Sequence, residues 1–145
     1  MIAEYREKFL NWTKETAKLS PEKKIAAFFQ IFMQFSAENK ICPVATLGLE
    51  LHTLPTSMAS EIRELLRLET IWLEQTIIDG QNAQVFLNQE KPQVIVRKLI
   101  TLVLGAQILA RIEGTSGPII EAKKMSLQIL TAPEIFSSAT RCLTS

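Results

Sequence analysis

This chain of 145 residues is poor in the side chains that build most metal and redox sites, with one His and two Cys. Cys42 and Cys142 lie too far apart in the sequence to indicate a disulfide framework, so we expect reduced thiols. His52 has no second His or Cys at metal-ligand spacing, and the sequence contains no Glu-x-x-His pair. These absences predict a protein without a bound metal and without a cofactor.

The sequence also lacks an excess of positive or negative charge and has no long apolar run. A formal charge of +1 argues against a chain that binds DNA mainly through a basic surface. The most apolar run, Leu99 to Ala110, is shorter than the ~20 residues of a membrane span. Charged residues are spread over positions 1–20 and leave no apolar signal core. We therefore expect a soluble, cytoplasmic, single-domain protein that does not interact with a membrane.

What the sequence does contain is helical periodicity. Apolar residues recur at spacings of three and four, which predicts α-helices rather than strands. The expected helices cover about residues 2–19, 21–39, 43–52, 57–79, 92–113 and 119–131. This pattern predicts an all-α fold of about six helices in one domain over residues 1–131. A tail rich in Ser and Thr over residues 132–145 follows that domain.

Residues with strong capping preferences mark the expected helix ends. Ser20 followed by Pro21 is a typical helix start. The Ser side-chain oxygen can accept a hydrogen bond from a backbone N–H of the first turn. Pro is well tolerated at the first helical position, because the N–H that it lacks would have no partner within the helix. Further starts are expected at Pro43 and Pro92. Glycine readily adopts the left-handed conformation that ends many helices, which predicts ends at Gly80 and Gly114. The residues after Gly80, 81–90, form a polar connection.

The helix expected over residues 92–113 is apolar on more than one face. A core stripe contains Ile95, Leu99, Leu102, Ala106 and Leu109, and a second stripe contains Leu104, Ile108 and Ile112. The last helix likewise has apolar residues on two sides. A monomer of this size covers one such stripe more easily than two, so the pattern predicts a twofold four-helix interface. Its predicted residues are Thr101, Leu104, Ile108, Met125 and Ile129. Alternatively, both helices are simply central in the monomer.

A carboxylate interrupts the apolar stripe of the helix expected over residues 57–79. Glu69 falls between Leu66 and Trp72, and Thr76 lies on the same side. A bare carboxylate in a core is costly, so Glu69 must be paired, protonated or facing a cavity. One interpretation makes Glu69 the polar anchor of a ligand pocket. The other is a Glu that reaches solvent and pairs with Arg63 or Arg67.

The aromatic face of the helix expected over residues 21–39 has the same two interpretations. Phe28, Phe29, Phe32 and Met33 either line an apolar pocket or form plain core. Combining this face with the stripe around Glu69, we predict a pocket lined by Phe28, Phe32, Leu47, Glu69, Trp72 and Thr76.

Catalytic motifs are lacking. The sequence has no phosphate-cradling Gly-rich loop and no nucleophile elbow, and His52 is the only base available to a Ser or Cys. Cys42 comes just before a helix start, which favours a thiolate, although a small buried Cys is the usual case. We predict that the protein is not an enzyme.

Three segments resemble one known family. Residues 41–51, ICPVATLGLEL, resemble the Gly-Cys-x-x-x-Asn-Leu-Ala-Leu-Glu-Leu segment in the C-terminal domain of TetR-type transcriptional regulators. Residues 105–111, GAQILAR, are similar to the Gly-Ala-x-x-Leu-Ala-Arg stretch of that family, with Trp72, Gly80 and Lys91-Pro92 in the expected order. The opening residues 1–9 look like the linking helix that follows the family's DNA-binding domain. Ile41, Thr46 and Gln84 depart from the pattern at positions where Gly, Asn and Gly are usual.

The resemblance implies an effector-binding and dimerisation domain over residues 1–131, with residues 1–19 as the linking helix. In the family, the last two long helices form the dimer and the preceding helices enclose a small, mostly apolar effector. The family's helix-turn-helix signature is absent from this sequence, so we expect DNA binding only through a domain that is not present here. The alternatives are a helical protein–protein adaptor without a pocket, and a small enzyme that uses His52 or Cys42.

Overall fold

The computed structural model describes residues 2–132, and this part of the chain is helical without strands, which confirms the all-α prediction. The tail predicted over residues 132–145 lies, apart from Ala132, outside the described residues. The elements are α1 (Ile2–Glu15), α2 (Pro21–Ala37), α3 (Pro43–Gly48), a 3-10 turn η1 (Leu51–Thr53), α4 (Thr56–Asn82), α5 (Pro92–Glu113) and α6 (Gly117–Thr131).

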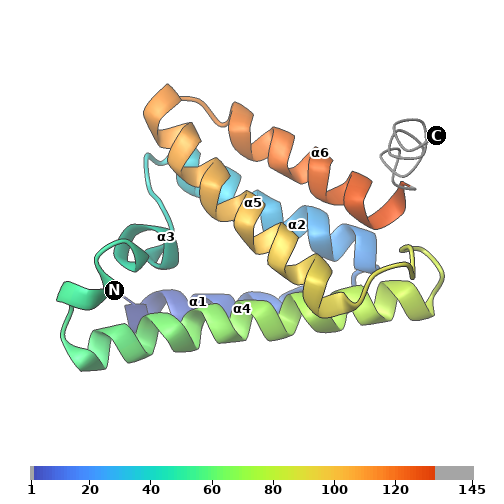
Figure 1. Cartoon of the computed structure of the whole chain (residues 1–145), viewed down its shortest axis with the longest axis horizontal. Helices are drawn as coiled ribbons and strands as arrows, with labels where there is room; N and C mark the ends of the chain where they lie inside the picture. The colour runs from blue at the N-terminus through green and yellow to red at the C-terminus, as the bar shows by residue number, and fades with distance from the viewer. Residues whose placement is uncertain (1, 133–145) are drawn as a thin grey trace, which may run out of the picture.

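The longest helix, α4, lies along one side of the bundle (Figure 1), where it contacts α1, α2, α3 and α5. Figure 1 shows α1 lying along α4, while α5 crosses the molecule diagonally toward α6 and α2 lies behind α5. The closest packing joins α5 to α6, and α2 contacts α4, α5 and α6. The short helix α3 packs on both α4 and α5. This arrangement places the aromatic face of α2 at the centre of the core.

Most of the predicted helix ends are confirmed. The Ser20 side chain accepts a hydrogen bond from the Lys23 backbone N–H at 3.4 Å, and Pro21 opens α2. Pro43 and Pro92 open α3 and α5. Gly114 ends α5 in the left-handed conformation, with φ of 71°. The first helix stops at Glu15 rather than near residue 19, and the expected helix over residues 43–52 divides into α3 and η1.

The prediction that Gly80 ends its helix is wrong. Helix α4 continues through Gly80 to Asn82, and the left-handed residue comes later, at Gln84, with φ of 61°. Gly80 is needed for a different reason, because a Cβ at this position would overlap the ring of Phe86. Phe86 itself is buried within the connection expected to be polar, so a tertiary contact explains this glycine.

The buried face of α5 differs from the predicted core stripe. Ile95, Leu99 and Ala106 are in the core, but Leu109 is 51% exposed. The core side of the helix is instead completed by Val96, Ile100, Val103 and Ala110. Because all of these residues are apolar, periodicity alone did not identify the face that packs inward.

Among the described helices, α5 is the one whose length and mean hydropathy of 1.6 would suit a membrane span. Residues on its inner side, including Leu99 and Val103, belong to the hydrophobic core, and the helix contacts α2, α4 and α6. These contacts are compatible with a core helix of a soluble protein, which passes the same test of length and hydropathy.

Candidate functional site

The carboxyl of Glu69 lies inside the bundle, on the side of α4 that faces α1. Glu69 is 2% exposed, and the Tyr5 hydroxyl donates a hydrogen bond to Glu69 Oε1 at a distance of 3.3 Å. The interpretation of Glu69 as a solvent-reaching partner of an arginine is wrong. Arg67 instead donates two hydrogen bonds to Glu64, at 2.6 and 2.7 Å, on the exposed side of the helix.

Burial governs the ionisation of this carboxyl. Removal from water raises the pKa of Glu69 from 4.5 to about 7, and the hydrogen bond from Tyr5 opposes that rise. Burial and the nearby carboxyl also raise the pKa of Tyr5, so its phenol remains protonated and continues to donate. The site therefore contains a carboxyl that can gain or lose its proton near neutral pH.

Cys42 and Gln107 extend the set of buried polar side chains from Glu69 and Tyr5 toward α5. The Cys42 backbone N–H donates to Gln107 Oε1 at 3.0 Å, and Gln107 Nε2 donates to Cys42 Sγ at 3.3 Å. Sγ also accepts the Ala45 N–H at 3.5 Å and so caps α3. Burial raises the pKa of Cys42 to about 11, which keeps the thiol protonated. Cys42 is therefore a small buried cysteine, the more usual of the two expected cases.

Aromatic rings from three helices meet on the other side of the site. Phe28 of α2 stacks on Trp72 of α4 with ring centroids 5.8 Å apart, and Phe32 lies 4.9 Å from Phe28. From α1, the Trp12 and Phe9 rings lie 4.7 and 6.4 Å from Trp72. We refer to Phe9, Trp12, Phe28, Phe32 and Trp72 as the aromatic cluster.

The fold thus brings together several of the predicted pocket residues. Phe28, Phe32 and Trp72 are in the aromatic cluster, while Glu69 lies one helical turn before Trp72 on α4. Thr76 is buried on the same helix, where its hydroxyl donates to the Trp72 carbonyl at 2.9 Å. Leu47 is separate, half-buried on α3. Phe28 and Phe32 expose almost no surface, so they are packed core in this structure.

A groove opens beside the aromatic cluster, between α1 and α2. It has a volume of about 290 Å³, and its apolar lining consists of Tyr5, Phe9, Trp12, Ile31 and Phe35. Lys8, Gln34, Glu38 and Lys40 form its rim. This groove was not predicted from the sequence, although three of its residues, Tyr5, Phe9 and Trp12, follow one another at helical spacings of four and three. Tyr5 connects the groove to the buried carboxyl, because it lines one and donates to the other.

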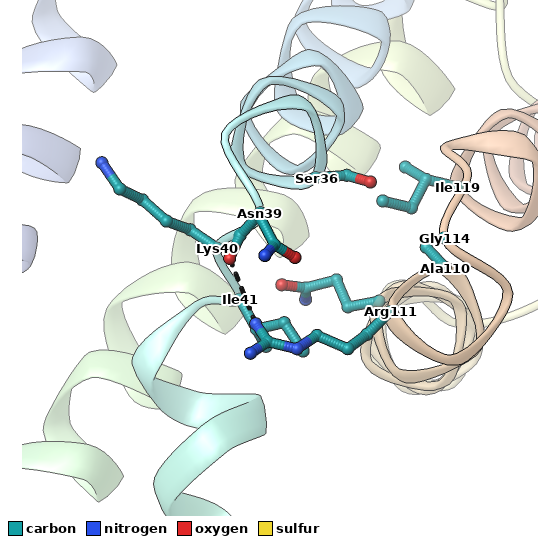
Figure 2. A pocket seen from close by; sticks show the side chains of 9 residues that line it. Ser36, Asn39, Lys40, Ile41, Ala110, Arg111, Gly114 and Ile119 are labelled. Carbon is teal, nitrogen blue, oxygen red and sulfur yellow. Dashed lines mark hydrogen bonds between the residues drawn. The ribbon is translucent and has the colours of Figure 1, made fainter.

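A second hollow, of about 210 Å³, lies where α2 and α5 end (Figure 2). Arg111 donates from Nη1 to the Asn39 carbonyl across its mouth, at 3.2 Å. Asn39 has a positive φ of 57° directly after α2. Arg111 lies in the last turn of α5, so this hydrogen bond joins the end of α5 to the residues that follow α2.

Several large apolar side chains are exposed on the outer side of α5 and α6. Of the residues predicted for a dimer interface, Thr101 and Met125 line one groove between the two helices. Ile108 lies on the exposed side of α5, whereas Leu104 and Ile129 are partly buried against the core. Further large apolar side chains on this side are Leu109, 51% exposed, and Ile112, 76% exposed.

His52 is exposed in η1. Within residues 2–132, no group of three or more His, Cys, Asp or Glu side chains is placed to hold a metal ion.

Comparison of this chain with protein-family models, with curated proteins and with solved structures finds no match.

Proposed function

We propose that this chain is the effector-binding and dimerisation domain of a cytoplasmic, TetR-type transcriptional regulator, and that it is not an enzyme. The observation that carries the proposal is the buried Glu69 carboxyl beside the aromatic cluster. A site of apolar walls with one polar anchor is typical of small-molecule binding. The proposed ligand is small and mostly apolar, and it binds between α1, α2 and α4.

The position of the groove supports a signalling role for α1. Tyr5, Phe9 and Trp12 all belong to α1, which corresponds to the linking helix of the family. A ligand that enters the groove contacts this helix on one side and α2 on the other. If the ligand binds one position of α1 more tightly, it shifts the population toward that position. The movement of α1 would then control a helix-turn-helix domain joined to it.

The exposed apolar side of α5 and α6 supports the proposed homodimer. Ile108, Leu109, Ile112 and Met125 are large apolar side chains that the chain itself leaves at least a third exposed. Pairing this side with that of a second copy would cover them in a four-helix arrangement.

Native mass spectrometry of the purified chain tests both parts of the proposal. We expect a dimer that releases a small molecule when it is denatured. Ile108→Glu and Met125→Glu should give monomers, because a charge would be buried at the interface. Ile71→Glu is the matched control, since Ile71 is 49% exposed on α4 and lies outside this face. A monomeric wild-type chain would refute the proposed dimer.

The close packing of Phe28 and Phe32 favours one other function, a helical protein–protein adaptor. An adaptor needs no ligand site and would use the exposed side of α5 and α6 to bind a different protein. A monomer in native mass spectrometry that also binds no small apolar compound would support the adaptor.

A further inference from the structure

Glu69 is the one acidic or basic residue that is buried within residues 2–132. The hydrogen bond that reaches its side chain comes from the neutral Tyr5 phenol. Lysines do lie at the rim of the nearby groove, but Lys8 pairs with Glu4 at 2.8 Å and Lys40 pairs with Glu38 at 2.7 Å. The carboxyl inside the bundle is thus left without a positive partner from these side chains.

The rings around this carboxyl have the chemistry that attracts organic cations. Tyr5, Phe9, Trp12 and Phe35 line the groove, and Trp72 lies 4.7 Å from Trp12. Aromatic faces attract positive charge through their quadrupole, and quaternary ammonium groups are often bound in this way. When Glu69 is ionised, its carboxylate behind Tyr5 adds a negative charge close to these rings, which neither a neutral nor an anionic ligand would use.

From these observations we propose that the effector of this site is a small organic cation with an apolar or aromatic body. Its positive group lies against the rings of α1 near Tyr5, where it is attracted by Glu69. The inference rests on the proposed ligand site and specifies the charge of the ligand. Tyr5 is the residue that separates the groove from the carboxyl, so displacement of its hydroxyl would bring the cation and Glu69 closer.

Ionisation of Glu69 makes the affinity for a cation depend on pH. The titratable groups that interact with Glu69 are the Tyr5 phenol from α1 and the Cys42 thiol from the start of α3, both of which remain protonated and therefore uncharged near neutral pH. The buried side chains of α2 are apolar, and Gln107 of α5 is uncharged. Because the pKa of Glu69 is about 7, a cation should bind about tenfold more tightly at pH 8 than at pH 6.

Tryptophan fluorescence can report on this site alone, because the two Trp residues of the chain are Trp12 and Trp72. The probes are phenyltrimethylammonium and tert-butylbenzene, which have the same shape and differ in charge. We expect the cation to bind more tightly than the neutral compound at pH 8. Glu69→Gln should weaken binding of the cation by about tenfold or more and leave binding of tert-butylbenzene nearly unchanged.

Glu61→Gln is the matched control, because it removes an exposed carboxyl from the same helix and alters the net charge equally. Circular dichroism shows whether each variant is folded. If both probes bind equally, and Glu69→Gln affects neither, the site accepts apolar ligands without regard to charge and the cation proposal is overturned. If neither probe changes the fluorescence, the proposed ligand site itself is refuted.

Discussion

Replacement of Glu69 by Gln should change how the stability of this protein depends on pH. In the folded chain burial raises the pKa of Glu69 to about 7, whereas the unfolded chain has the ordinary value of 4.5. Between these values the folded state binds more protons than the unfolded state, so stability falls as pH rises. The stabilising contribution of the protonated carboxyl is complete below pH 4.5 and is lost above about pH 7.

The size of this effect follows from the two pKa values. A tenfold change in a proton-binding equilibrium corresponds to about 1.4 kcal/mol. The difference between the folded and unfolded pKa values of Glu69 therefore contributes about 3 kcal/mol to the free energy of unfolding at low pH. About 2.5 kcal/mol of it should appear between pH 5 and pH 8. For a domain of this length, that loss corresponds to a decrease of about 10 °C in Tm. Glu69→Gln removes the titrating group and should therefore remove this part of the pH dependence.

Urea unfolding followed by circular dichroism measures the effect at a constant protein concentration. The quantity to compare is the free energy of unfolding of Glu69→Gln minus that of the wild type, at each pH. This difference should rise by about 2.5 kcal/mol from pH 5 to pH 8, while Glu61→Gln should follow the wild type. A difference for Glu69→Gln that stays constant across the range would refute the assignment of a protonated, buried carboxyl.

Three other predictions concern Gly80, Gly105 and Cys42. Gly80→Ala should lower the free energy of unfolding by about 1–3 kcal/mol, because the added methyl overlaps the Phe86 ring. Gly105→Ala, which meets no atom within 4 Å, should instead raise it by about 0.5–1 kcal/mol through helix propensity. Equal urea midpoints for these two variants would contradict the close contact at Gly80. Cys42 should resist a thiol reagent in the native protein and react in denaturant, because it is buried and its thiol stays protonated. Peptide mass spectrometry after alkylation distinguishes it from Cys142, and rapid native labelling of Cys42 would contradict this prediction.

Sequence signals predicted the structure correctly where the interactions involve only neighbouring residues. Ser20 caps α2 through its own side chain, and Gly114 ends α5 because glycine adopts a positive φ at little cost. Gly80 shows where such signals fail. Its surroundings resemble a helix end, but the glycine is required by the ring of Phe86 from a later loop.

In the candidate site, too, features set by neighbouring residues were predicted and features set by distant residues were not. Periodicity placed Glu69, Trp72 and Thr76 on one side of a helix, and burial of that side is confirmed for Glu69 and Thr76. Tyr5, the partner of Glu69, lies 64 positions earlier in the chain, and no spacing rule connects the two. The groove was missed for a related reason, because its walls come from α1 and α2, which the fold brings together at contacts such as that of Tyr5 with Phe35.

The helical fold, the positions where most helices begin and end, and the presence of one acidic residue among apolar ones follow from the amino-acid sequence alone. These features depend on backbone preferences and on periodicity, which act over a few residues. Packing between the helices determined which side of α5 faces inward, because Val103 and Leu109 are both apolar and only Val103 is buried. It also decided that Glu69 meets a phenol rather than an arginine, because that choice depends on how α1 packs against α4.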